Sequence, residues 1–115
     1  DPVASYIESF DALDPVASDP DLLVLPSHGD VFRGLDLRLE QLRRHHVEQL
    51  DRLLGLMDEP ATANDLARRM FRMRLDALNT VLAHGETLAH VRYLVNRGLA
   101  KVVPGEGPRR YVRAA

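Results

Sequence analysis

Apolar side chains spaced three or four residues apart run along positions 35–57, and this stripe constrains the fold more than any other feature of the chain. It consists of Leu35, Leu39, Leu42, His46, Leu50, Leu53 and Met57. Steps of three and four place these side chains on one face of an α-helix, so the spacing predicts an amphipathic helix about 30 Å long. A helix with one apolar face has to pack against other elements, which predicts a helical domain around it.

The segments after this helix predict further helices followed by a β-hairpin. TANDLARRMF has Thr62 or Asn64 as its expected N-cap. RLDALNTVLAHG and ETLAHVRYLVNRG are expected to form two separate helices that end at Gly85 and Gly98. Two β-prone runs, LAKVV and RRYVRA, flank the turn PGEGP. This order is typical of a winged helix-turn-helix with three or four helices, so the expected class is mainly α within α+β.

Residues 1–34 have a different pattern, in which a helix precedes a short buried strand. An Asp-Pro pair starts the helix, apolar residues recur at helical spacing as far as Leu13, and Pro15 is expected to end it. The run LLVLP at 22–26 is apolar on both faces and closed by proline, which predicts a buried strand. One helix and one strand cannot bury their own apolar surface, and the chain offers this strand no evident neighbour.

The charge changes sign where these two patterns meet. Residues 1–34 carry seven acidic residues and one arginine, a net charge of −6, whereas residues 35–115 carry ten acidic and fourteen basic residues, a net charge of +4. Together these give the −2 of the whole chain. A step of this size predicts two units, residues 1–34 and residues 35–115, with different surroundings.

Composition excludes several classes of protein. With 45% hydrophobic and 28% charged residues, the chain has the balance of a globular protein rather than a disordered one. It contains no cysteine, which excludes disulfides and thiolate chemistry and predicts a reducing, cytoplasmic location. No apolar run approaches the roughly 18 residues that a membrane span needs, so no membrane association is expected.

His28 is the first candidate for a functional residue. It follows the predicted strand in the turn PSHG, and the carboxyl end of a strand is where α/β folds gather their chemistry. Histidine is also a common zinc ligand, although a turn histidine bonded to its own backbone is the commoner local arrangement. The remaining histidines are His45, His46, His84 and His90, and their spacings match no metal motif. The chain also lacks a nucleophile motif and a phosphate loop.

Arginines support a second hypothesis, nucleic-acid binding. One group surrounds the second helix of the expected winged helix and consists of Arg68, Arg69, Arg72 and Arg74. Arg92 and Arg97 lie on the expected recognition helix, and Arg109 and Arg110 lie on the wing, where such residues meet bases and phosphates. The helix offers few side chains suited to base edges, and +4 over this region is mild for a nucleic-acid binder. Solvated arginines or an intramolecular interface are therefore favoured over nucleic acid.

Taken together, the chain resembles the C-terminal end of a metallo-β-lactamase-fold hydrolase with an appended winged-helix domain, in the subgroup of glyoxalase II-like hydrolases and β-lactamase-like endoribonucleases. Residues 1–32, DPVASYIESFDALDPVASDPDLLVLPSHGDVF, look like the closing helix, last strand and metal-histidine turn of that family, usually written PGHG. LRRHHVEQLDRLLGLM, TANDLARRMF, GETLAHVRYLVNRGLAKVV and YVR look like its appended domain. Ser27 departs from the family, because glycine is usual there and a side chain changes what the tight turn can adopt.

The resemblance implies that residues 1–34 are the remnant of an αββα catalytic domain and that His28 is its last metal ligand. In that family a pair of zinc-like ions activates a water molecule for attack. The other ligands would lie upstream, so these 115 residues would be an inactive C-terminal fragment whose first partner is its own upstream catalytic domain. Residues 35–115 would then cover the active-site mouth or mediate self-association. A homodimer through Leu39, Leu42, His46 and Leu50 of the long helix is a further alternative.

Overall fold

The computed structural model describes residues 1–72 and 76–115, and within these residues it contains four helices and a three-stranded sheet. The helices are α1 (Pro2–Ala17), α2 (Leu35–Gly55), α3 (Ala63–Met70) and α4 (Ala77–Asn96), and the strands are β1 (Ala61–Thr62), β2 (Ala100–Val103) and β3 (Arg110–Arg113). This composition confirms the mainly α, α+β class. No helix in the described part of the chain is long and apolar enough to span a bilayer.

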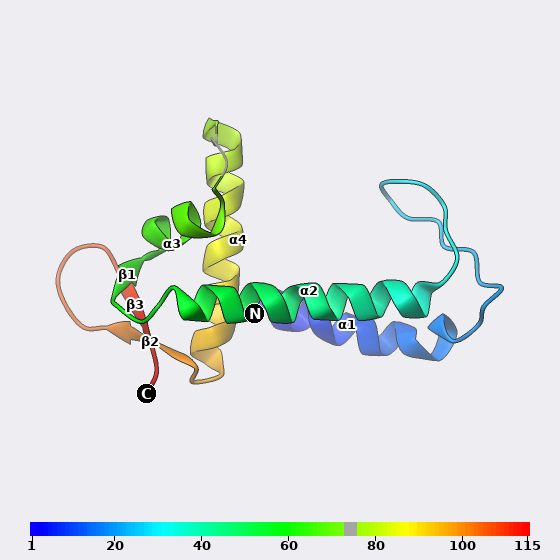
Figure 1. The fold of residues 1–115 in the computed structure, drawn as a ribbon, viewed down its shortest axis with the longest axis horizontal. Coiled ribbons are helices and arrows are strands. Elements are labelled where there is room, and N and C mark those ends of the chain that lie inside the picture. The colour runs from blue at the N-terminus through cyan, green and yellow to red at the C-terminus, as the bar shows by residue number, and fades with distance from the viewer. Residues whose placement is uncertain (73–75) are drawn as a thin grey trace.

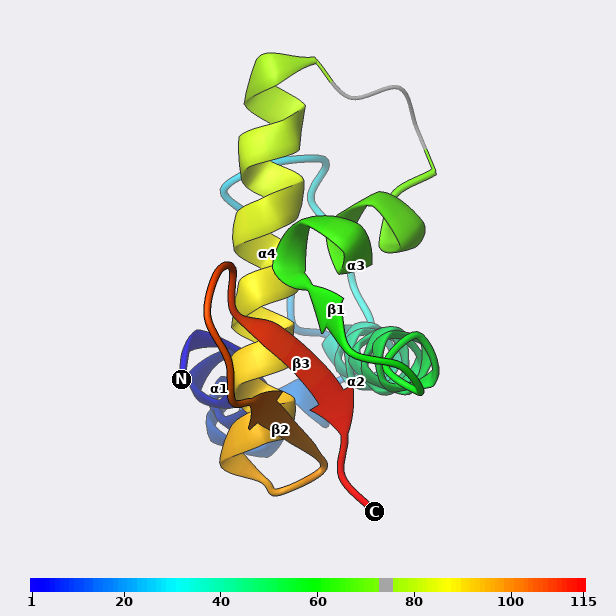
Figure 2. The ribbon, with the colours of Figure 1, turned by 90° about the vertical axis from the view of Figure 1, so that its left-hand side faces the viewer.

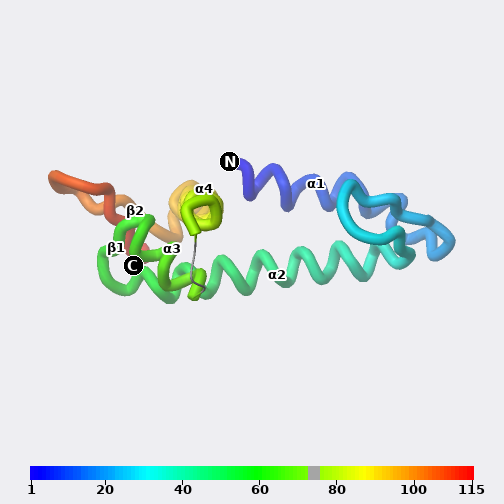
Figure 3. The backbone as a smooth tube through the Cα atoms, turned by 90° about the horizontal axis from the view of Figure 1, so that it is seen from above, coloured from blue at the N-terminus to red at the C-terminus, as the bar shows by residue number. Residues whose placement is uncertain are grey.

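The long helix α2 is the axis of the molecule (Figure 1). α1 lies beside it and runs in the opposite direction, as the view from above shows (Figure 3). α4 crosses both helices, and its first half extends beyond the rest of the fold (Figure 2). The strand order is β1-β3-β2 with antiparallel pairing throughout, so the predicted hairpin forms and gains a short third strand that the sequence did not indicate.

The apolar stripe of α2 is confirmed, and two clusters of buried side chains share it. The larger cluster joins the second half of α2 to α3, α4 and the sheet, and its fully buried members include Leu53, Met57, Leu66, Val91 and Leu94. The smaller cluster joins the first half of α2 to α1 and consists of Phe10, Ala17, Leu35 and Leu39.

The helix predicted to stop at Pro15 continues to Ala17, so that prediction is wrong. Proline removes one backbone N–H, and the missing bond falls in the last turn, where Asp11 and Pro15 are exposed. Water can satisfy the carbonyl group left without a partner. The buried side chain of Ala17, which belongs to the smaller cluster, favours one further turn of helix.

The two separate helices predicted around Gly85 are also wrong, because α4 runs through this residue without a break. Gly85 does not adopt a positive φ, so it has no helix-ending conformation. The flanking side chains of Ala83 and Thr87 are buried on one face, and this packing outweighs the helix-breaking tendency of glycine. Gly98, with φ of +71°, does follow the end of the helix as predicted. The predicted start at Arg74 lies outside the described residues.

The predicted buried strand at 22–26 does not form. Only Val24 makes a bridge, to Phe32, while Leu23 is 49% exposed and Leu25 is 74% exposed. An extended segment becomes a strand by pairing with a neighbour, and the described residues offer it none besides Phe32. Apolar side chains in this segment are therefore left on the surface.

Candidate functional site

The turn that carries His28 lies at the tip of a closed loop. The backbone N–H of Val24 donates to the carbonyl of Phe32 (2.8 Å), and the N–H of Phe32 donates back to Val24 (3.2 Å). Gly29 adopts a φ of +89°, which a residue with a side chain rarely adopts. The Arg33 guanidinium donates to the Asp21 carbonyl and ties the base of the loop. His28 is thereby held on a constrained turn with its imidazole exposed.

In the part of the chain that the structure describes, His28 is not part of a cluster of metal-binding side chains. Among residues 1–72 and 76–115, no group of three or more His, Cys, Asp or Glu side chains could hold a metal ion. A catalytic zinc ion needs about three protein ligands. The residues present therefore do not make a complete site, and His28 offers a single donor.

The structure separates the candidate arginines into two environments. Arg92 and Arg109 line one groove of about 330 Å³ between α4 and the sheet, with an apolar floor that includes Val91 and Tyr111. Arg110 lies next to Arg109 at a second hollow beside the turn at 104–108. This arrangement brings three of the four predicted residues to the same end of the molecule.

Arg97 lines neither of these hollows, and its guanidinium contacts other groups of the chain. Its guanidinium stacks on the Tyr93 ring at 3.6 Å and lies 3.7 Å from the Asp1 carboxylate. The Asn96 amide also donates to Asp1 at 2.9 Å. These contacts join the start of α1 to the end of α4, and a role of Arg97 in nucleic-acid binding stays a prediction. The arginines predicted around the second helix of the winged helix include Arg74, which lies outside the described residues.

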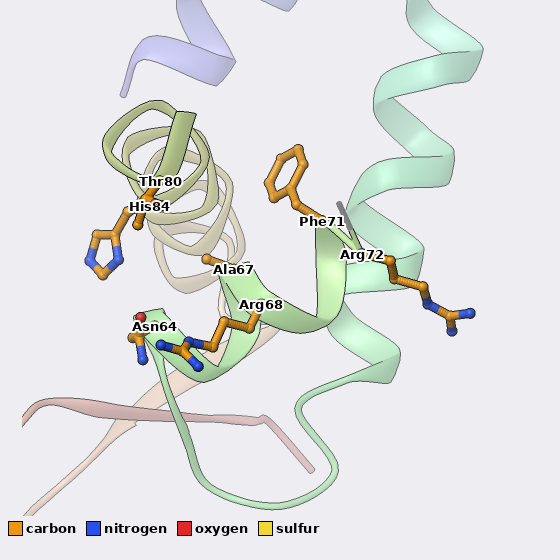
Figure 4. Close-up of a pocket in the computed structure, with 7 residues that line it drawn as sticks. All are labelled: Asn64, Ala67, Arg68, Phe71, Arg72, Thr80 and His84. Atoms are coloured by element: carbon orange, nitrogen blue, oxygen red, sulfur yellow. The ribbon is translucent and has the colours of Figure 1, made fainter. Parts of the chain in front are cut away.

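A pocket of about 390 Å³ between α3 and α4 was not indicated by the sequence (Figure 4). Its lining consists of Asn64, Ala67, Arg68, Phe71, Arg72, Thr80 and His84. The side chains of Asn64, Arg68 and His84 lie around the same space, whereas Arg72 points away from it (Figure 4). Two groups that can carry positive charge thus face one hollow. Sequence spacing could not reveal this, because the pocket depends on how two helices pack.

His46 and His90 form a stacked pair where α1, α2 and α4 meet. Their ring centroids are 5.7 Å apart with an interplanar angle of 19°, and Tyr6 of α1 meets the His46 ring edge-on at 5.3 Å. His90 Nδ1 lies 2.8 Å from the Glu86 carbonyl oxygen, to which it donates. Within the described residues, His46 Nδ1 and His90 Nε2 are buried without a partner. Burial, followed by the proximity of His90 and His45, lowers the pKa of His46 despite the opposing effect of Glu86.

The packing of α1 and α4 against α2 covers part of the surface that a homodimer through α2 would use. Leu39 is buried against α1, and Leu50 is buried in the larger cluster with α4. His46 is stacked on His90. Self-association of the chain stays a prediction.

We expect His46 to make the protein less stable in mild acid. An unfolded histidine binds a proton as the pH falls through about 6.5, whereas folded His46 resists protonation because its pKa is lowered. The unfolded state then binds more protons, so stability falls as the pH drops below about 6.5. When the pH is lowered from about 7.5 to 5.5, the melting temperature of His46→Phe should fall less than that of the parent. Circular dichroism measures both melting temperatures. His45→Gln, on the exposed neighbour, is the control. Equal losses in the parent and His46→Phe would contradict the prediction.

Comparisons with known proteins cover both parts of the chain. A family model described as metallo-beta-lactamase-like, C-terminal domain, matches residues 50–114. A crystal structure of a beta-lactamase domain protein from Burkholderia ambifaria is 39% identical with a TM-score of 0.89, and the match covers 98% of this chain and 34% of that one. A metallo-beta-lactamase family protein from Thermus thermophilus is 32% identical with a TM-score of 0.78, and the match covers 97% and 33%. The chain spans about a third of each structure. No curated protein is similar enough to count as a match.

Proposed function

The chain belongs to the metallo-beta-lactamase-like C-terminal domain family, and we propose that it is the C-terminal third of a metal-dependent hydrolase whose catalytic domain precedes residue 1. One observation carries this proposal. Proteins about three times as long match almost the whole chain, at 98% and 97% coverage, and so share residues 1–34 as well as the helical part. Residues 1–34 are then the end of the catalytic domain, and residues 35–115 are the appended winged-helix domain.

The turn at His28 supports a role in metal binding. Its imidazole is exposed on a loop that is closed by two backbone hydrogen bonds, and in the part of the chain that the structure describes it belongs to no group of three or more metal-binding side chains. A zinc site shared with the preceding domain would use such a single, constrained donor. The metal would supply an activated water for hydrolysis, and the part of His28 is to position one ligand atom.

Exposed apolar side chains support the assignment of residues 1–34. Leu23, Leu25 and Val31 are 49%, 74% and 58% exposed, although the sequence pattern predicts a buried strand here. Burying such side chains stabilises a fold by about 1.5–3 kcal/mol each. A sheet in the preceding domain would provide a strand with which the extended segment at 22–26 could pair.

The arrangement of α2, α3, α4 and the hairpin supports the winged-helix assignment for residues 35–115. The domain would cover the active-site mouth and restrict access of substrate. Its own activity would then be absent, because the reaction takes place on the preceding domain.

Metal content tests the proposal. The longer protein, purified without chelator, should retain about two zinc-like ions per chain, whereas the 115-residue chain should retain none after gel filtration, because it lacks a full ligand set. Inductively coupled plasma mass spectrometry measures both. Hydrolysis should be tested on ester, thioester, lactam and RNA substrates. A longer protein that holds no metal and cleaves none of these would overturn the proposal.

Nucleic-acid binding is the second candidate function, and the groove shared by Arg92 and Arg109 is the observation that favours it. The exposed apolar side chains of Leu78, Val81 and Leu82 on α4 oppose it, since base edges and phosphates need polar partners. We therefore expect no duplex or single-stranded binding by this chain at about 50 mM salt in a fluorescence anisotropy titration. Binding that weakens with salt, and that is lost on combining Arg92→Ala with Arg109→Ala, would support the second function instead.

A further inference from the structure

Four exposed apolar side chains form a stripe on the outer face of α4, three of them on its protruding first half and the fourth at the start of its second half. Leu78, Val81 and Leu82 are 68%, 68% and 59% exposed, and Leu88 is 38% exposed. Their spacing places them opposite Ala83, Thr87 and His90, which are the buried side chains of the same helix. The first half of α4, which carries Leu78, Val81 and Leu82, extends well clear of α2 and the sheet (Figures 1 and 2), whereas Leu88 borders the groove between α4 and the sheet. A single exposed leucine needs no explanation, but several large apolar side chains on one exposed helix face indicate a contact surface.

A second copy of this chain is a poor occupant of the stripe. A stable dimer buries about 800 Å² per partner, contributed by roughly 20–30 residues on each side. The stripe offers four large apolar side chains on one helix that projects by itself. A domain tethered by the chain needs less contact, because the tether raises its effective concentration to the order of millimolar.

The position of Asp1 in the fold favours a tethered domain as the occupant of the stripe. Asp1 is held beside the end of α4 by Asn96 and Arg97. The stripe lies eight to eighteen residues earlier on the same helix, which corresponds to about 12–27 Å. A domain attached at Asp1 spans this distance, since even a small domain is about 30 Å across.

The segment that holds the exposed apolar residues 22–31 lies on the same side of the α1–α2 pair as the first half of α4 (Figures 1 and 2). The segment between α1 and α2 and the first half of α4 both rise from the same side of the α1–α2 pair (Figures 1 and 2). A single domain placed between the segment at residues 22–31 and the first half of α4 would contact both. Matches to proteins about three times as long indicate that a body of this size is available.

We propose that the α4 stripe, formed by Leu78, Val81, Leu82 and Leu88, is the docking surface for the domain that precedes Asp1 in the longer protein. The proposal rests on the proposed function only for the existence of that domain, and it is independent of metal binding and hydrolysis. α4 is then an interdomain helix rather than a nucleic-acid recognition helix.

Cysteine labelling tests this surface directly, because the chain contains no cysteine of its own. Val81→Cys places one thiol on the stripe, and Val47→Cys, on α2 at 57% exposure, is the matched control. Both are made in the 115-residue chain and in the longer protein, with any cysteines elsewhere replaced by serine and circular dichroism confirming the fold. Maleimide modification at Val81→Cys should be about tenfold or more slower in the longer protein, because modification requires access to the thiol. Val47→Cys should react at similar rates in both.

Two results would overturn the proposal. The first is equal modification of Val81→Cys, and of the second probe Leu78→Cys, in the longer protein and the 115-residue chain. The second is slow modification in the 115-residue chain that becomes fast on dilution, which would identify a second copy as the occupant. Metal content measured on the same samples distinguishes failure of the docking surface from failure of the proposed function. Protection of Val81→Cys without bound metal would overturn the proposed function and support the docking surface.

Discussion

Replacing Leu66 with alanine should lower the free energy of unfolding by about 2–5 kcal/mol, a large share of the roughly 5–15 kcal/mol that holds a typical domain together. Leu66 is fully buried in the larger cluster, to which Leu53, Met57, Val91 and Leu94 also belong. Alanine would leave a cavity bounded by α2, α3 and α4, and rigid helices cannot close around it fully. Urea denaturation followed by circular dichroism measures the change.

The short helix α3 makes this substitution more damaging than its volume suggests. α3 has eight residues, fewer than an isolated helix needs in water. A capping box supports its start: the Thr62 hydroxyl accepts from the Asp65 N–H at 3.1 Å, and the Asp65 carboxylate accepts from the Thr62 N–H at 3.0 Å. The Thr62 hydroxyl also donates to the Asp65 carboxylate at 2.7 Å, and this bond, followed by the one from the Thr62 N–H, lowers the pKa of Asp65. Caps contribute only about 1 kcal/mol, so burial of Leu66 has to hold α3 in place.

Leu78→Ala is the control for the Leu66 substitution. It removes the same side-chain atoms from a site that is 68% exposed in this chain, and its effect should stay within about 0.5 kcal/mol. Equal and small effects of both substitutions would contradict the described core.

The sequence predicted those parts of the fold that depend on local pattern. The stripe on α2 follows from one helix with one buried face, and Gly98 follows from a conformation that only glycine adopts easily. The errors arise where packing competes with local preference. Gly85 lies within a helix because Ala83 and Thr87 are buried on either side of it, and Pro15 is tolerated because its missing hydrogen bond falls at an exposed helix end.

The candidate sites divide in the same way. The His28 turn was recognisable because proline, glycine and the apolar run lie within a few residues of one another. The groove of Arg92 and Arg109 and the pocket of Asn64, Arg68 and His84 join residues from different elements, so no local spacing could reveal them. Arg97 shows the converse, because its partner Asp1 is at the far end of the sequence.

The largest functional effect is expected from His28→Ala in the longer protein. If His28 donates to a metal, alanine removes that ligand outright. Loss of a residue that only orients a ligand already costs about 10–100-fold in metal affinity or activity, so loss of the ligand itself should reduce hydrolysis by about 100-fold or more. About one metal ion per chain should also be lost or weakened. Initial rates and metal content on the same preparation measure the two effects.

Folding should not account for this loss, because His28 is exposed and lies on a turn outside both buried clusters. The melting temperature of the 115-residue chain should therefore be almost the same with and without His28→Ala. His45→Ala, which removes another exposed imidazole, is the matched control and should leave metal content and rate unchanged. An unchanged metal content and rate in His28→Ala would show that the imidazole is only a turn residue. A loss of activity together with a lowered melting temperature would instead assign His28 a structural role.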